Sequence, residues 1–210
     1  MNKIRQTGFG FESRLLLLCK DTHLFALSFM KKRRIVISGS PGGGKTTLIN
    51  ALDGMGYAVY NEFSRSIIEK GLKEGKGRYF LTDPESFSQA LFLGRRKQFE
   101  DFDTQKSNFP HVFYDRGIPD IYAYLEAHGK ASSKWAKITA PFQYDFVFLV
   151  TPWKAIYKKD EARMETFEEA AHYFSFIESV YTKKHPVFYL PEDTVEARLA
   201  YIAAKLKQHG

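Results

Sequence analysis

Short runs of apolar residues alternate with longer segments of helical periodicity from Met30 to the end of the chain. Each run is rich in Val, Ile, Phe or Tyr, which is typical of strands that are covered on both faces of a sheet. Strands that alternate with helices predict βαβ units and a parallel sheet. The expected strands are Arg34–Ser38, Ala58–Tyr60, Val112–Tyr114, Phe146–Val150 and Val187–Leu190.

Helix start signals mark three of the segments between or after these strands. An aspartate followed by a proline suits the N-cap and the first helical position. The sequences TFEE and DTVE have the pattern of a capping box, in which two residues satisfy each other's backbone N–H groups. The expected helices run from Pro84 to about Phe102, from Thr166 to about Lys183, and from Asp193 toward the end of the chain.

The composition is that of one globular domain. The 210 residues suit a single hydrophobic core, and 44% of them are hydrophobic and 26% charged. The formal net charge of +7 favours anionic ligands such as nucleotides, and it is compatible with peripheral contact with an acidic membrane. The sequence shows no basic stripe interleaved with aromatic residues, which argues against nucleic acid as a partner. No pattern indicates an oligomeric state.

The cysteine and histidine residues narrow the picture further. Cys19 is the only cysteine, which excludes an internal disulfide and favours a cytoplasmic protein. The six histidines are scattered without the spacing of metal ligands, which argues against a protein-bound zinc site.

Residues 1–29 do not continue the alternating pattern. Their apolar runs, SRLLLLCK and THLFALSF, are separated by Lys20 and Asp21, and both are too short to cross a bilayer. The two runs could form one short amphipathic helix against the domain or a membrane surface. Alternatively, Met30 is the natural start and residues 1–29 are an upstream extension. We therefore expect an N-terminal extension of uncertain status, residues 1–29, and one domain, residues 30–210.

The segment GSPGGGKTT follows the first strand and precedes a helical pattern. It fits G-x-x-x-x-G-K-[ST] at every position. Glycines let successive backbone N–H groups turn inward around an anion, and the following helix adds the positive end of its dipole. The Lys45 ammonium can then reach the β- and γ-phosphates of ATP, and the Thr46 hydroxyl can coordinate Mg²⁺. The expected nucleotide-binding residues are Gly39, Ser40, Pro41, Gly42, Gly43, Gly44, Lys45, Thr46 and Thr47.

The segment HVFYDRGIPD ends an apolar strand at Asp115, where a P-loop fold places the carboxylate that faces Mg²⁺. Alternatively, Asp115 caps a helix that begins near Pro119. Motor ATPases usually have a second acid directly after this aspartate to polarise water. Arg116 occupies that place, and its cation suits an anionic substrate or a phosphoryl group in transfer. The substitution favours transfer to an acceptor over hydrolysis coupled to motion.

The segment YNEFSR follows the second strand, at the sheet edge where open α/β folds bind ligands. Glu62 could accept the proton of an acceptor hydroxyl or orient the acceptor. Arg65 could share a helix face with it. Alternatively, the two residues are only the charged start of a helix.

Two further basic segments have a functional and a plain interpretation. Lys158, Lys159 and Arg163 follow the fourth strand, and they could fold over the phosphates as a lid or form a solvated loop. The segment GRRKQ, residues 94–98, lies inside a helix, and there we expect a solvated face rather than substrate contact.

The chain from about Arg34 to Gln208 resembles an AAA-type ATPase domain family of P-loop kinase-like proteins. The segments that carry the resemblance are GSPGGGKTTL, NEFSR, YDRGIPDIYAYL, KKDEARMETFEEA and LPEDTVEAR. That family includes the nicotinamide riboside kinase-like domain of NadR and an animal trafficking protein that binds phosphoinositides and GTP. The Asp115–Arg116 pair followed by AYLE is also similar to thymidylate-kinase-type enzymes.

The resemblance implies an α/β fold of the three-layer P-loop NTPase type, nucleoside- or nucleotide-kinase-like, with a five-stranded parallel sheet. It implies that the Asp115 strand lies beside the Gly39 strand and that Asp115 faces the metal. It also implies that Arg163 belongs to a lid and that the loop at 190–194 lies near the base. The chain lacks the sensor-arginine pattern of ring motors, which argues against that class.

The function that we expect is Mg-ATP-dependent phosphoryl transfer to a nucleoside- or nucleotide-like small molecule. The alternative is an ATP- or GTP-controlled binding module or ATPase that recruits a protein or an anionic lipid. The sequence has no Asn-Lys-x-Asp guanine motif, which favours ATP over GTP. In the kinase interpretation the catalytic residues are Lys45, Glu62, Asp115, Arg116 and Arg163, the acceptor contacts are Glu62, Arg65 and Arg116, and the Mg²⁺ ligands are Thr46 and Asp115.

Overall fold

The computed structural model describes residues 31–75, 82–107, 109–157 and 166–209. The N-terminal extension lies outside these ranges, and so do Lys158, Lys159 and Arg163, the basic residues of the predicted lid. Among the helices in the described ranges, none is both long and apolar enough to span a bilayer.

A five-stranded parallel sheet forms the centre of the domain, with the strand order β2-β3-β1-β4-β5. The five apolar runs predicted as strands are all strands, and β3 lies directly beside β1 as expected. From β1 the chain passes over one strand position to form β2, and β3 then fills the place between β2 and β1. The last two strands, β4 and β5, lie on the other side of β1. The strand order thus reverses at the carboxyl ends of β1 and β3, and open α/β sheets bind ligands at such a reversal. The strands are β1 (Arg33–Gly39), β2 (Ala58–Tyr60), β3 (His111–Asp115), β4 (Phe146–Val150) and β5 (Val187–Leu190).

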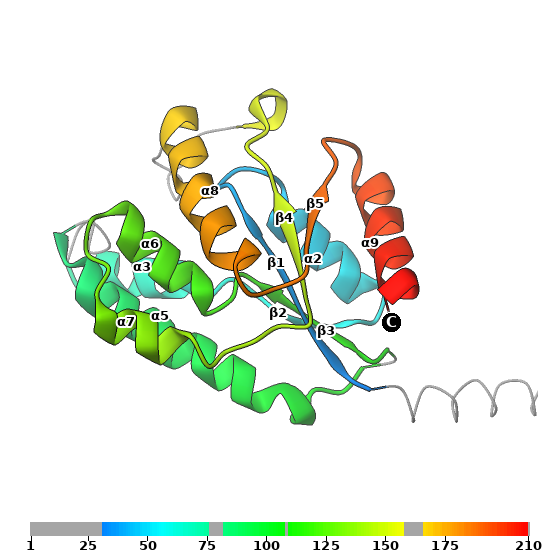
Figure 1. The fold of residues 1–210 in the computed structure, drawn as a ribbon, viewed down its shortest axis with the longest axis horizontal. Coiled ribbons are helices and arrows are strands. Elements are labelled where there is room, and N and C mark those ends of the chain that lie inside the picture. Colours follow the sequence, from blue (N-terminus) through cyan, green and yellow to red (C-terminus); the bar gives the residue numbers. More distant parts are fainter. Residues whose placement is uncertain (1–30, 76–81, 108, 158–165, 210) are drawn as a thin grey trace, which may run out of the picture.

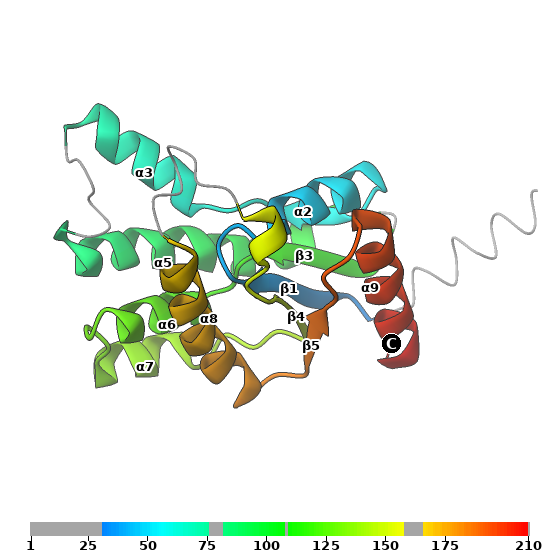
Figure 2. The same ribbon diagram turned by 90° about the horizontal axis from the view of Figure 1, so that it is seen from above.

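Helices cover both faces of the sheet and complete a three-layer α/β fold (Figures 1 and 2). One face packs against α2 and α9, and the other packs against α6, α8 and the end of α5. A smaller core joins α5, α6 and α7, with α3 packed along its edge. The helices are α2 (Lys45–Gly54), α3 (Ser64–Lys73), α5 (Pro84–Glu100), α6 (Pro119–Ala127), α7 (Ser133–Thr139), α8 (Phe167–Thr182) and α9 (Val195–His209), with short 3₁₀ helices η1 (Asp101–Thr104) and η2 (Lys154–Ile156).

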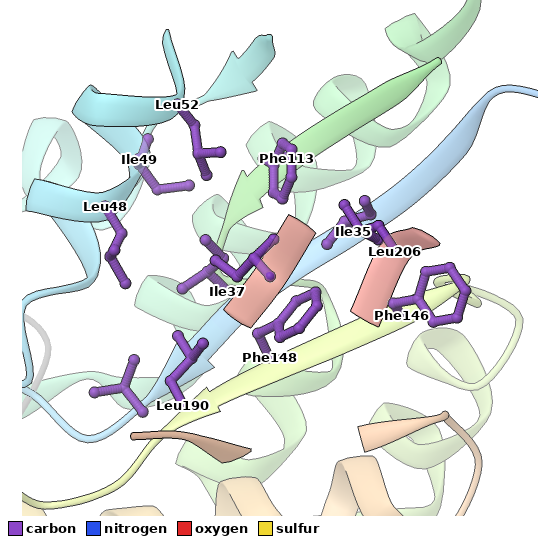
Figure 3. Close-up of a cluster of buried hydrophobic side chains, with 12 residues drawn as sticks. Ile35, Ile37, Leu48, Ile49, Leu52, Phe113, Phe146, Phe148, Leu190 and Leu206 are labelled. Atoms are coloured by element: carbon purple, nitrogen blue, oxygen red, sulfur yellow. The ribbon is translucent and has the colours of Figure 1, made fainter. Parts of the chain in front are cut away.

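The main core holds both ends of the loop formed by residues 39–46, which we call the phosphate loop. Ile35 and Ile37 of β1 point to the same face, where Leu48 and Ile49 of α2 pack over them (Figure 3). All four side chains are fully buried, and burial of each contributes about 1.5–3 kcal/mol relative to exposure. Because the strand before the loop and the helix after it share this core, the loop between them has fixed ends.

The capping signals were correct at two helices and wrong at the third. The Asp83 side chain accepts a hydrogen bond from the backbone N–H of Ser86, and Thr166 and Glu169 form the predicted capping box. The terminal helix, however, begins one residue later than the DTVE pattern predicts. Thr194 is the residue whose hydroxyl and carbonyl cap the helix, so the position of the reciprocal acid is occupied by an alanine that has no side-chain acceptor.

Candidate active site

The loop between β1 and α2 has the backbone of an anion cradle. Gly39, Gly42 and Gly44 have φ values of 116°, 78° and 83°, which side chains other than glycine rarely adopt. At Gly39 a Cβ atom would also overlap the backbone carbonyl of Val150, so only glycine lets β1 end against β4 there. The loop leads directly into α2, whose first backbone N–H groups have no partner within the helix.

Lys45 lies beneath this loop. Its side chain is 7% exposed, and its Nζ atom donates hydrogen bonds to the carbonyl oxygens of Ser40, at 2.6 Å, and Gly39, at 3.4 Å. Burial, followed by the charge of Arg116, lowers the pKa of the Lys45 ammonium, while Asp115 and Glu62 oppose that shift. An anion bound in the loop would relieve this unfavourable burial, because it would bring the ammonium a counter-charge.

Asp115 ends β3 beside the start of α2. Its Oδ2 atom accepts a hydrogen bond from the Thr46 hydroxyl at 3.2 Å, while its buried Oδ1 atom has no hydrogen-bond partner. Burial and the nearby Glu62 raise the pKa of Asp115, against the effects of Lys45 and Arg116. The cap interpretation does not hold, because Asp120 rather than Asp115 accepts from the backbone at the start of α6.

Thr46 and Asp115 together fit a magnesium ion. Mg²⁺ prefers hard oxygen ligands and is usually held by one or two protein groups, with phosphate oxygens and water completing its octahedron. A hydroxyl oxygen and a carboxylate with one unpartnered buried oxygen are suitable ligands of this kind. In the described ranges no cluster of three His, Cys, Asp or Glu side chains offers an alternative metal site.

Glu62 follows β2 and lies between two arginine side chains. Its carboxylate is 2.9 Å from Arg95 Nη2 and 2.7 Å from Arg116 Nε, and it also accepts from the backbone N–H of Ser64. Burial raises the pKa of Glu62, but the charges of Arg95 and Arg116 outweigh that effect and hold it below the usual value. The carboxylate is therefore ionised at neutral pH and fixed in one orientation.

Arg95 is a site residue that the sequence interpretation placed wrongly. Its neighbours Arg96 and Lys97 are exposed and pair along the helix with Glu100 and Asp101, as predicted for a solvated face. Arg95 itself is only 4% exposed and donates to the Gly117 carbonyl and to Glu62. It lies four residues after the buried Leu91, so helical spacing places it on the apolar face. This i, i+4 relation was the signal in the sequence.

Arg116 connects Glu62 to the phosphate loop. Its Nη1 atom donates to the Gly39 carbonyl at 3.2 Å and to Asp120 Oδ1 at 3.0 Å, in addition to the Glu62 pair. Its φ of 71° is unusual for a residue with a side chain, and such backbone strain is commonly found at functional sites. The position directly after Asp115, noted in the sequence, thus places this cation between Glu62 and the phosphate loop.

Asp120 holds the Arg116 guanidinium in place through a buried ion pair. The carboxylate accepts from the Ser38 hydroxyl, from the Gly117 N–H at 2.9 Å and from the Tyr181 hydroxyl at 2.5 Å. Burial raises the pKa of Asp120, but the charges of Arg116 and Arg95 outweigh that effect and hold the pKa below its usual value. The carboxylate is therefore ionised. The sequence analysis missed this residue, although it lies four positions after Arg116 on the first turn of α6.

We expect the Asp120→Asn variant to lose about 3 kcal/mol of unfolding free energy, because the buried charges of Arg116 and Arg95 would then share Glu62 as their one remaining carboxylate partner among the described residues. The asparagine amide would also direct donor hydrogens at the Tyr181 hydroxyl or the Gly117 N–H. Urea denaturation followed by circular dichroism measures the change. The matched Glu100→Gln variant, which breaks an exposed pair, should change stability by less than about 1 kcal/mol. Equal stability of the two variants would contradict the anchoring role of Asp120.

Two further predicted residues, Arg65 and Thr47, are exposed. Arg65 is an exposed residue of α3, and among the described residues no ion pair joins it to Glu62. Thr47 is exposed on the first turn of α2. Arg163 lies outside the described residues, so its place in a lid stays a prediction.

Arg198 is a second buried arginine that the sequence analysis did not single out. It lies on the first turn of α9 and is 3% exposed, and its Nη1 atom donates to the Gly43 carbonyl of the phosphate loop at 2.8 Å. The only signal in the sequence was its place at the end of the segment LPEDTVEAR.

Comparison with known proteins agrees with this architecture. A family described as an AAA domain matches residues 34–198. No curated protein matches the chain. Among solved structures, the chain is similar to a deoxyadenosine kinase from M. mycoides with the products dCMP and a flexible dCDP bound, at a TM-score of 0.60 and 17% identity. That alignment covers 83% of this chain and 99% of the kinase.

Two more solved structures show the same likeness. The same deoxyadenosine kinase with bound dATP aligns at a TM-score of 0.54 and 15% identity, again over 83% of this chain and 99% of that one. A thymidylate kinase from Candida albicans aligns at a TM-score of 0.62 and 15% identity, over 86% of this chain and 94% of the enzyme. At these identities the likeness establishes the fold, which is that of P-loop nucleoside and nucleotide kinases.

Proposed function

The chain belongs to the AAA domain family that matches it over most of its length, and from this premise we propose that it is an ATP-dependent kinase of small molecules. The phosphoryl acceptor in this proposal is a hydroxyl or phosphate group of a nucleoside- or nucleotide-like compound. The observation that carries the proposal is the position of Glu62, an ionised carboxylate held by two arginines beside the phosphate loop.

The phosphate loop would bind the ATP triphosphate. The backbone N–H groups of residues 42–46 would surround the β-phosphate, and Lys45 would exchange its bonds to Ser40 and Gly39 for the β- and γ-phosphate oxygens. Thr46 and Asp115 would hold Mg²⁺, which neutralises charge on the β- and γ-phosphates when bound. Arg163 would add a further cation from the lid.

Glu62 and Arg116 would bind the acceptor. Arg116 bonds both to Glu62 and to the Gly39 carbonyl of the phosphate loop, which supports a place for this carboxylate near the γ-phosphate of a bound ATP. Arg95 and Arg116 hold Glu62 in one rotamer, which reduces the entropy lost when the acceptor hydroxyl is positioned.

The reaction would then be an in-line displacement. The acceptor oxygen forms a bond to the γ-phosphorus as the bond from that phosphorus to the β–γ bridging oxygen breaks, and ADP leaves. For a hydroxyl acceptor, its proton passes to the Glu62 carboxylate and then to solvent. Lys45 and Arg116 would stabilise the charge that develops on the transferring group.

A direct test is mass spectrometry of nucleosides, nucleotides and a small-metabolite pool incubated with Mg-ATP and the full chain. A product heavier by one phosphoryl group, absent when the Lys45→Ala variant replaces the wild type, is the expected result and names the acceptor. Slow loss of ATP without a phosphorylated product would contradict the proposal. It would favour a nucleotide-controlled binding module instead, and would direct the search to protein and anionic-lipid partners.

A further inference from the structure

Arg198 joins three loops at the ligand-binding edge of the sheet. Besides the bond to Gly43, its Nε atom donates to the carbonyl of Pro191 at 2.7 Å, and its guanidinium lies 4.7 Å from the centre of the Trp153 ring. These three partners belong to the loops that follow β1, β5 and β4, which gather at the same edge of the sheet (Figure 1). The arginine thus connects the phosphate loop to the loops on its outer side.

The bond to Gly43 determines which way the peptide between Gly43 and Gly44 faces. In a trans peptide the carbonyl and the following N–H point in opposite directions, and no cis peptide occurs among the described residues. Because Arg198 holds the Gly43 carbonyl toward α9, the trans peptide turns the N–H of Gly44 away from α9. A phosphate bound in the loop would lie on that side of the peptide in our proposal. If the same peptide rotated, it would present a carbonyl oxygen to the anion.

The charge of Arg198 has no carboxylate in direct contact. No ion pair involves it among the described residues, and its polar contacts there are with carbonyl oxygens and an aromatic face. Glu192 and Asp193 act on it only at longer range, and burial lowers its pKa. A buried cation without an acidic partner is costly in a ligand-free protein. An anion on the other side of the Gly43–Gly44 peptide would offset this cost, since the peptide dipole is aligned between the two charges.

We propose that Arg198 is a positioning residue for phosphate binding: it fixes the Gly43–Gly44 peptide so that its N–H faces the bound phosphate, and its charge strengthens that donor. This inference rests on the proposed nucleotide-binding function and adds a specific residue to it. The arginine acts through the loop backbone rather than by touching the nucleotide.

The test compares wild type, Arg198→Met and Arg198→Lys, all as full chains, by isothermal titration calorimetry with ATP and with inorganic tripolyphosphate. Methionine keeps the length and apolar character of the stem but removes the charge and all donors. We expect this variant to weaken ATP and tripolyphosphate binding by the same factor, about tenfold or more. Lysine keeps the positive charge and can donate hydrogen bonds from one nitrogen, but it lacks the planar guanidinium that reaches two carbonyls at once. We therefore expect an intermediate loss of affinity.

The matched control is Arg33→Met, which removes another arginine that lies over an aromatic ring, 5.2 Å from the centre of Phe146, at the opposite end of β1. It should leave both affinities unchanged. Thermal unfolding of each variant measures whether it is folded. A structural strut alone predicts that the lysine charge restores no affinity, so that Arg198→Lys would bind as weakly as Arg198→Met.

Three results would separate the inference from the proposed function. If wild type binds ATP and tripolyphosphate but Arg198→Met binds tripolyphosphate equally well, the inference fails while nucleotide binding stands. The inference also fails if ATP binding weakens without any change for tripolyphosphate, because the effect would then arise at the base. If wild type binds neither compound, the nucleotide-binding function itself is wrong.

Discussion

Replacement of Lys45 by alanine is expected to abolish detectable phosphoryl transfer and to remove most of the affinity for ATP. The ammonium lies against the phosphate loop, where it now bonds to the carbonyls of Ser40 and Gly39. Loss of one preorganised donor to a developing charge typically lowers kcat by about 10²–10³-fold, and the weaker ATP binding adds to this effect. Turnover by coupled ADP detection and ATP affinity by calorimetry measure the two parts.

The same variant should fold normally, which separates a functional from a structural role. Burial disfavours the charged form of Lys45, so the ligand-free protein gains no stability from this cation, and its removal should not lower the unfolding temperature. The control Lys97→Ala removes an exposed lysine that pairs only along its own helix with Asp101, and it should leave both ATP affinity and turnover as in wild type. An active Lys45→Ala variant would show that the loop does not deliver the transferred phosphate.

The sheet and the phosphate loop could be predicted because local sequence determines them. Apolar runs such as Phe146–Val150 are buried on both faces, so the run itself marks the strand. The loop needs glycine at 42 and 44 because their φ values are positive, and that reason acts within the residue itself. Asp115 and Glu62 could be placed at the site because each follows a strand, and parallel strands end at one edge.

The features that could not be predicted depend on contacts between distant segments. Helical spacing puts Arg95 on the apolar face of its helix, but only the folded chain brings it to Glu62, and only the folded chain brings Arg198 to Gly43. Asp120 looks like the acidic first turn of a helix, but its partners come from β1 and α8. The helix α7, also absent from the prediction, is seven residues long and is held chiefly by the burial of Trp135. Short helices of this kind are stabilised by tertiary packing rather than by propensity.

The Glu62→Gln variant is expected to lower kcat by about 10²–10⁴-fold while ATP affinity stays near that of wild type. The amide is nearly isosteric but cannot accept a proton from the acceptor hydroxyl. It also loses its charge pairs with Arg95 and Arg116, although Arg116 keeps Asp120 and Arg95 keeps the Gly117 carbonyl. The phosphate loop should therefore keep its shape, and the loss should fall on the transfer step and the acceptor.

The pH dependence gives this prediction its sharpest form. A group that accepts a proton must be ionised, and the two arginines hold the pKa of Glu62 below its usual value against the opposing effect of burial. Wild-type kcat at saturating Mg-ATP, where Asp115 would already hold the metal, should therefore persist to a lower pH than an ordinary glutamate would allow, and should fall as the pH drops through the depressed pKa of Glu62. The residual activity of Glu62→Gln should lack that acid limb, whereas the exposed Glu69→Gln on α3 should keep both the limb and full turnover. Unchanged kcat in Glu62→Gln would remove this carboxylate from the transfer step, and the acceptor proton would then have to leave by another route.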